Sequence, residues 1–186
     1  MENIKKTHIV DDAKESISLL IKERLPWLLL GLIGGIIVSF IISRFEAVLS
    51  ENITLAFFLP FIVYMSDAVG TQTENVYVRS LAHGDVQFHI YLIKECVQGI
   101  LLGGIFGGII ASIALVWLHN TDTALIVGLS MFYTMAISPI MALLVPELLF
   151  KKHRDPALGA GPFTTIIQNL ISVLIYFSIA SLILHK

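Results

Sequence analysis

The chain has 186 residues, of which 56% are hydrophobic and only 14% are charged, and its formal net charge at pH 7 is −2. Soluble domains carry roughly 25% charged residues, so the composition excludes an ordinary soluble domain and predicts an integral membrane protein. A nucleic-acid partner is also excluded, because the chain lacks the basic surplus that neutralises phosphates.

The N-terminal segment, residues 1–25, is charged and is too long and too acidic for the n-region of a cleavable signal. Apolar residues recur among charges between residues 11 and 24, a pattern that indicates an amphipathic helix on the inner membrane surface. We therefore expect residues 1–25 to form a cytoplasmic segment and residues 26–186 to form one transmembrane domain.

Five apolar runs without charge follow this segment. Each is close to the roughly 20 residues that a helix needs to cross a bilayer. They predict five transmembrane helices, which we call spans one to five, around residues 26–43, 52–66, 97–118, 123–146 and 156–184.

Lysine and arginine residues in the short connecting segments predict the orientation, because cytoplasmic loops are enriched in them. Of the 12 Lys and Arg residues, all except Arg44 and Lys186 lie in the N-terminal segment or near the connections between spans two and three and spans four and five. The N-terminus is therefore expected in the cytoplasm and, with five spans, the C-terminus outside.

Span two carries two ionisable groups, Asp67 and Glu74. Seven residues make nearly two helical turns, so both carboxylates share a face with Thr71, and Asn75 lies beside them. Hard cations such as Mg²⁺ bind oxygen ligands, and Mg²⁺ keeps several waters while touching one or two carboxylates. Two alternatives stay open: Glu74 is solvated near the cytoplasmic end, or Asp67, the deeper group, is a structural hydrogen-bond acceptor.

Span five carries a second polar strip at helical spacings of three and four. Its candidate metal ligands are Thr165, Gln168 and Asn169, and Ser172 and Tyr176 continue the same face. Hydrogen bonding between helices would explain the strip equally well, at about 0.6 kcal/mol per bond.

Glycines and prolines predict how the middle spans pack. Span four contains Pro139 and Pro146, which remove backbone donors and are expected to kink or end the helix. Span three contains five glycines that would put small residues on one helical face and let a neighbouring helix approach closely: Gly99, Gly103, Gly104, Gly107 and Gly108.

Patterns typical of enzymes were not found in the sequence. The histidines fall in polar ends or loops, and there is no nucleophile elbow, zincin motif or phosphate-binding glycine loop. We therefore expect no enzymatic activity and no required cofactor.

Several short segments recur in the order and spacing of a known family, and they cover almost the whole chain. The chain resembles the transmembrane domain of the MgtE magnesium channels, whose eukaryotic relatives are solute carriers with two such domains. The segments that carry the resemblance are residues 24–27, 45–46, 60, 70–72, 78–82, 94–95, 155–157, 161–163 and 174–177.

The resemblance implies a homodimer in the inner (plasma) membrane, with a pore on the two-fold axis that spans two and five of both subunits line and through which hydrated Mg²⁺ enters the cytoplasm. The family usually has an aspartate where this chain has Asn169, and a Gly-Gly-Asn run where it has residues 66–68. Our hypothesis is that negative charge has moved from span five to Asp67 and Glu74 in span two.

The first functional hypothesis is therefore divalent-cation transport, with Mg²⁺, or Mn²⁺ or Co²⁺, as the transported ion. The alternatives are a non-transporting auxiliary subunit of a larger homologue and a carrier that couples the cation to H⁺ or Na⁺. The family's large cytoplasmic part has no counterpart in this sequence, so we expect regulation within the membrane or by a second membrane or regulatory chain.

Overall fold

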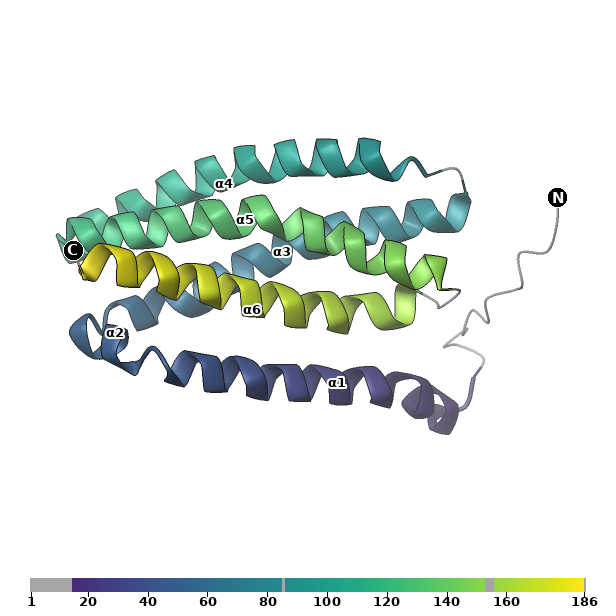
Figure 1. Ribbon diagram of the computed structural model, residues 1–186. Coiled ribbons are helices and arrows are strands. Elements are labelled where there is room, and N and C mark those ends of the chain that lie inside the picture. Colours follow the sequence, from purple (N-terminus) through teal and green to yellow (C-terminus); the bar gives the residue numbers. More distant parts are fainter. Residues whose placement is uncertain (1–14, 85, 153–155, 186) are drawn as a thin grey trace.

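The computed structural model describes residues 15–84, 86–152 and 156–185, and within these ranges it contains helices and no strand. Five of the helices are long and apolar enough to cross a membrane, which confirms the predicted all-α class with five candidate spans. Figure 1 shows these long helices side by side, with the short α2 at one end. The helices are α1 (Ile17–Ser43), α2 (Glu46–Glu51), α3 (Leu55–His83), α4 (Phe88–Leu118), α5 (Thr121–Lys151) and α6 (Pro156–Leu184).

The first helix, α1, includes part of the predicted N-terminal segment. It begins after Ser16, whose hydroxyl oxygen accepts a hydrogen bond from the Leu19 N–H at 3.4 Å, and runs through Pro26 to Ser43. The boundary predicted between residues 25 and 26 therefore lies inside α1, and the first turns are set at an angle to the rest of the helix (Figure 1). The first part of the predicted amphipathic helix, residues 11–14, lies outside the described residues.

The second and third spans extend beyond their uncharged runs. Helix α3 continues past Asp67 and Glu74 until Gly84, whose φ of 89° ends it. Helix α4 ends at His119 in the left-handed region, and Asn120 then caps α5 by accepting from the Thr123 N–H at 2.8 Å. A charge interrupts an apolar run in sequence, but only a backbone break interrupts the helix.

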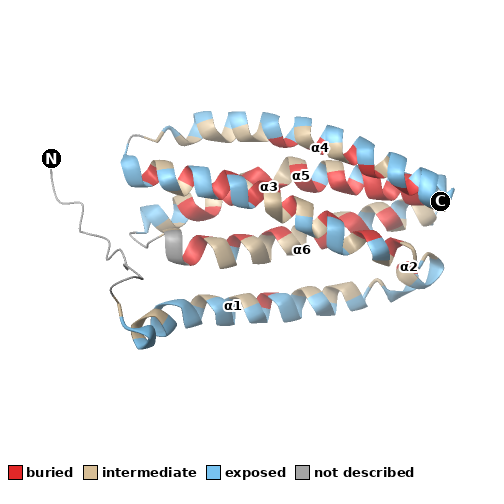
Figure 2. Ribbon diagram, turned by 180° about the vertical axis from the view of Figure 1, so that it is seen from behind, coloured by how far each residue is buried: buried red, intermediate tan, exposed pale blue. Residues whose placement is uncertain are grey.

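Helices α5 and α6 organise the packing. Helix α5 packs against α3, α4 and α6, and α6 packs against α1, α3 and α5. In Figure 2 the buried residues concentrate on α5 and on the faces of its neighbours, whereas α1 is mostly exposed. Only Gly34 is buried in α1, at a position where a Cβ would lie 2.5 Å from Ile166 Cγ2. Helix α1 is thus a peripheral helix that rests on α6.

Three glycines of α4 let its backbone touch that of α5. A Cβ at Gly99, Gly103 or Gly107 would lie within 2.7–2.8 Å of a backbone carbonyl oxygen of α5. Gly104 and Gly108 are exposed and would meet nothing within 4 Å, so the prediction that all five glycines share one packing face is wrong for these two. A step of one residue rotates a helical position by about 100°, which turns them away from α5.

This packing predicts a difference in stability between adjacent glycines. Gly103→Ala would place its Cβ 2.7 Å from the Phe132 carbonyl oxygen, and we expect it to lower the free energy of unfolding by about 1–3 kcal/mol because the backbones must separate. Gly104→Ala is the matched control. Thermal unfolding in detergent measures both, and equal melting temperatures would contradict the expected contact.

Helix α5 runs through both of its prolines to Lys151, so Pro139 and Pro146 do not end it, and Figure 1 shows the helix bending between its ends. Pro139 cannot donate to the Met135 carbonyl four residues earlier. This carbonyl lies against Gly99, where a Cβ would be 2.8 Å from the oxygen. The proline and the glycine therefore occur at the same point of the α4–α5 contact.

Candidate ion-binding site

The two predicted polar strips meet where α3 packs on α6. Thr165 Oγ1 donates a hydrogen bond of 3.0 Å to Asp67 Oδ1, and both side chains are partly exposed. One carboxylate oxygen is held by this bond, while the remaining acceptor capacity of the carboxylate is available to water or a hydrated cation. This hydrogen bond joins the polar strip of span two to that of span five.

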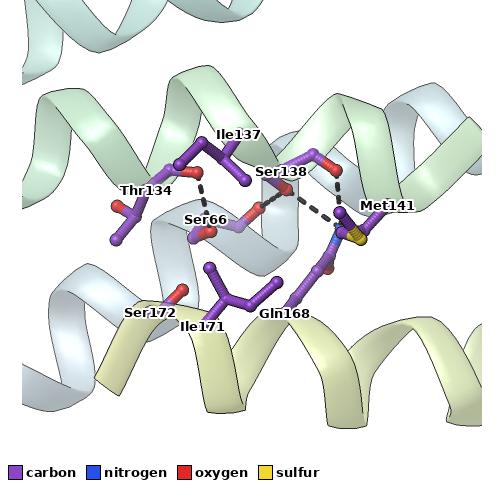
Figure 3. Close-up of a pocket in the computed structure, with 8 residues that line it drawn as sticks. All are labelled: Ser66, Thr134, Ile137, Ser138, Met141, Gln168, Ile171 and Ser172. Carbon is purple, nitrogen blue, oxygen red and sulfur yellow. Dashed lines mark hydrogen bonds between the residues drawn. The ribbon is translucent and has the colours of Figure 1, made fainter. Parts of the chain in front are cut away.

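Gln168 takes part in a buried contact between three helices. Its Nε2 donates to Ser138 Oγ at 3.0 Å and to the Ser138 carbonyl at 3.2 Å (Figure 3). The side chain crosses α3 at Gly70, where a Cβ would lie only 1.8 Å from Nε2. Gln168 is 3% exposed, so it has no access to the face that Asp67 shares with Thr165.

Glu74 is buried within the same contact between α3 and α6, with 9% of its surface exposed. A Cβ at Gly161 would lie 3.6 Å from Glu74 Oε1, and the Thr164 hydroxyl lies beside the carboxylate without a hydrogen bond of good geometry. The alternative that Glu74 is solvated is therefore wrong for the protomer. The ion pairs among the described residues, Glu147–Lys151 and Glu51–His185, do not involve it.

The other candidate residues point elsewhere. Thr71 and Asn75 are exposed on α3. Asn169 is partly exposed and lines a groove of about 370 Å³ between α1 and α6, together with Thr165. We call this the α1/α6 groove; its lining residues are Leu28, Gly31, Gly34, Gly35, Val38, Pro162, Thr165, Ile166 and Asn169. Thr165 belongs both to the groove and to the Asp67 pair, so the two features adjoin.

The seven candidate residues do not converge on one point within the protomer. Asp67 and Thr165 are in direct contact, Glu74 and Gln168 are buried in helix contacts, and the exposed residues face outward. In the described part of the chain, no three His, Cys, Asp or Glu residues gather closely enough to hold a metal ion.

Sequence reasoning missed a second row of polar contacts, on another face of α3. Thr73 donates to Glu95 Oε2 at 2.7 Å, and Tyr77 donates to Glu147 Oε2 at 2.6 Å. Ser80 Oγ and the Tyr91 hydroxyl share a third hydrogen bond of 2.8 Å. The spacing of Thr73, Tyr77 and Ser80 by four and three residues was the available signal. These bonds fasten α3 to α4 and α5.

The fold and these contacts define the class: a multi-pass helical membrane protein with carboxylate, hydroxyl and amide groups between its helices. Residues 59–179 match the family model MgtE, which is described as a divalent cation transporter. The chain belongs to the MgtE family, a family of transporters, and five of its described helices are long and apolar enough for a multi-pass membrane protein.

Curated relatives agree with this assignment. The magnesium transporter MgtE of Bacillus subtilis (strain 168) is 34% identical over 167 residues, which cover 88% of this chain and 37% of the relative. That of Enterococcus faecalis is 34% identical over 179 residues, 95% of this chain and 40% of the relative. That of Thermus thermophilus is 27% identical over 165 residues. The chain thus spans about two fifths or less of the length of these relatives.

Proposed function

We propose that this chain carries divalent cations, Mg²⁺ above all, across the plasma membrane as a homodimer whose pore is lined by α3 and α6 of both subunits. The hydrogen bond between Thr165 and Asp67 carries the proposal, because it joins a membrane-embedded carboxylate on α3 to the polar strip of α6. The description of the family as divalent cation transporters and the curated relatives, which are magnesium transporters, support it.

The proposed mechanism keeps the cation hydrated. Mg²⁺ sheds its waters reluctantly, so oxygen atoms of Thr71, Asn75 and Thr165 accept hydrogen bonds from those waters while Asp67 supplies the negative charge. Thr71 and Asn75 are exposed in the single protomer and are therefore available to face a second copy. The surplus of Lys and Arg on the N-terminal side supports a cytoplasmic mouth at the start of α1.

Flux into liposomes tests this function. Purified protein, reconstituted without other proteins, is expected to carry Mg²⁺ down its gradient into vesicles that contain a cation-sensitive dye. Entry of Mn²⁺ and of Co²⁺ is measured in the same way. Empty liposomes and liposomes with a denatured sample are the controls. Vesicles that stay silent for all three cations would overturn the proposal.

An auxiliary, non-transporting subunit is the second candidate. One observation favours it: Asn169 leaves α6 without a carboxylate beside the α1/α6 groove. Under this alternative, purification from native membranes recovers the chain only together with a larger homologue, and the chain alone gives no flux.

A coupled carrier is the third candidate, because Glu74 is a buried carboxylate that neither described ion pair compensates. Such a group exchanges a proton or a monovalent cation more readily than a solvated one does. Imposed H⁺ or Na⁺ gradients would then change the rate of divalent flux, and an unchanged rate removes this candidate.

A further inference from the structure

The contact around Gln168 links three helices at one level of the bundle. Gln168 on α6 donates twice to Ser138 on α5, and Ser138 Oγ in turn donates to the Ser66 carbonyl on α3 at 2.6 Å. Figure 3 shows these bonds as one connected chain. Ser66 Oγ adds a bond of 3.3 Å back to the Thr134 carbonyl on α5. We call this set of bonds the three-helix lock.

The hydrogen atoms of the lock fix the orientation of the Gln168 amide. The Ser138 carbonyl only accepts, so the atom that faces it must be the amide nitrogen. The hydroxyl groups of Ser138 and Ser66 already donate their hydrogen bonds to backbone carbonyls. Gln168 Oε1 consequently lacks a partner and is buried among apolar and hydroxyl side chains.

Residues of the three-helix lock lie before and after Asp67 in α3. Ser66 immediately precedes it, Gly70 follows it by three residues, and on α6 the residue that bonds Asp67 is Thr165, three residues before Gln168. Gly70 is required for this geometry, because any Cβ there would collide with Gln168 Nε2. The rotation of α3 about its axis, which decides where Asp67 points, is therefore held one residue before and one turn after the carboxylate.

We propose that Gln168 is a positioning residue: through Ser138 and Gly70 it fixes α3 against α6, so that Asp67 stays beside Thr165 and faces the ion path. This inference deepens the proposed function and rests on it, since Asp67 is the carboxylate of the proposed pore. It gives Gln168 a role different from that of the metal ligand that the sequence predicted.

Cysteine cross-linking tests the positioning without any need for transport. In a Cys96→Ser background, the pair Asp67→Cys and Thr165→Cys replaces two side chains whose oxygens are 3.0 Å apart, so mild oxidation should link them rapidly. Adding Gln168→Met, which keeps the length of the side chain and removes its donors, is expected to slow linking by at least about fivefold. Gln98→Met, at an exposed position on α4, is the matched control and should leave the rate unchanged.

Two further variants guard against local misfolding at one position. Ser138→Ala removes the acceptor hydroxyl and the bond to Ser66, and Gly70→Ala displaces the Gln168 amide, so both should also slow linking. If Gln168→Met, Ser138→Ala and Gly70→Ala all link at the rate of the parent pair, the lock does not position Asp67 and the inference is wrong.

Measurements of Mg²⁺ transport then distinguish a failure of this inference from a failure of the proposed function. Gln168→Met should raise the half-saturating Mg²⁺ concentration about fivefold in the parent chain but less than about twofold when Asp67→Asn is already present, because the effect acts through Asp67. Equal effects in both backgrounds would overturn the inference. A parent chain that carries no divalent cation refutes the proposed function, and the cross-linking rates still decide the role of Gln168.

Discussion

Asp67→Asn is expected to raise the Mg²⁺ concentration for half-maximal flux by about ten- to hundredfold, because removing one unit charge several Å from a divalent cation costs roughly 1–3 kcal/mol at the effective dielectric constants of such sites. The substitution keeps the size of the side chain and an oxygen that accepts the hydrogen bond from Thr165. The helix contact should therefore survive, and the change should report the charge. Flux into liposomes at a series of Mg²⁺ concentrations measures it.

Glu74→Gln provides the comparison for this experiment. The sequence left open that Glu74 is solvated near the cytoplasmic end, but the structure shows it buried against α6. We expect a smaller effect on half-maximal flux from Glu74→Gln than from Asp67→Asn, because a hydrated cation cannot contact a carboxylate that is 9% exposed. Wild-type flux in Asp67→Asn at matched expression would show that Asp67 is a structural acceptor, and a larger effect from Glu74→Gln would reverse the assignment.

Asn169→Asp in the Asp67→Asn background is expected to lower the Mg²⁺ concentration for half-maximal flux about tenfold, which restores part of the lost affinity. The added carboxylate would stand one turn after Thr165, on the side of α6 that lines the α1/α6 groove. Asn169 is partly exposed there, so the new charge does not have to be buried in an existing helix contact. The measurement is the same concentration series in liposomes.

The single variant Asn169→Asp serves as the control for the rescue. In the otherwise unchanged chain it should strengthen Mg²⁺ binding, because a second carboxylate adds attraction to that of Asp67. Absence of any recovery in the double variant, with both proteins folded, would mean that Asn169 and Asp67 do not act on the same cation. The hypothesis that charge moved from α6 to α3 would then fail.

The helices could be predicted from the sequence because lipid imposes a simple requirement on composition. Uncharged runs near 20 residues long located the five spans, and family-specific segments located the same domain. Their ends could not be predicted from charge: α3 continues for 16 residues after Asp67 because the break is Gly84. The six-residue helix α2 was missed, since so short an element has no clear periodicity.

The candidate site could be predicted only as two strips. Helical spacing placed Asp67 in one strip and Thr165 in the other, and the structure shows a hydrogen bond between these two residues. Which polar residues of a strip face a neighbour and which face outward depends on how the helix is rotated in the bundle, and spacing along one helix does not contain this information. Gln168 and Asn169 are adjacent in sequence, yet one is buried in the three-helix lock and the other lines the α1/α6 groove.

The central place of α6 has a consequence for the order of assembly in the membrane. Helix α6 comes last in the chain, and α1, which comes first, packs chiefly on it. If the helices insert one by one, α1 therefore lacks its main packing partner until α6 has been synthesised, while α4 and α5 can already pair through their glycines. The hydrogen bond between Thr165 and Asp67 therefore forms only after α6 has docked, and the proposed pore cannot be complete before that step.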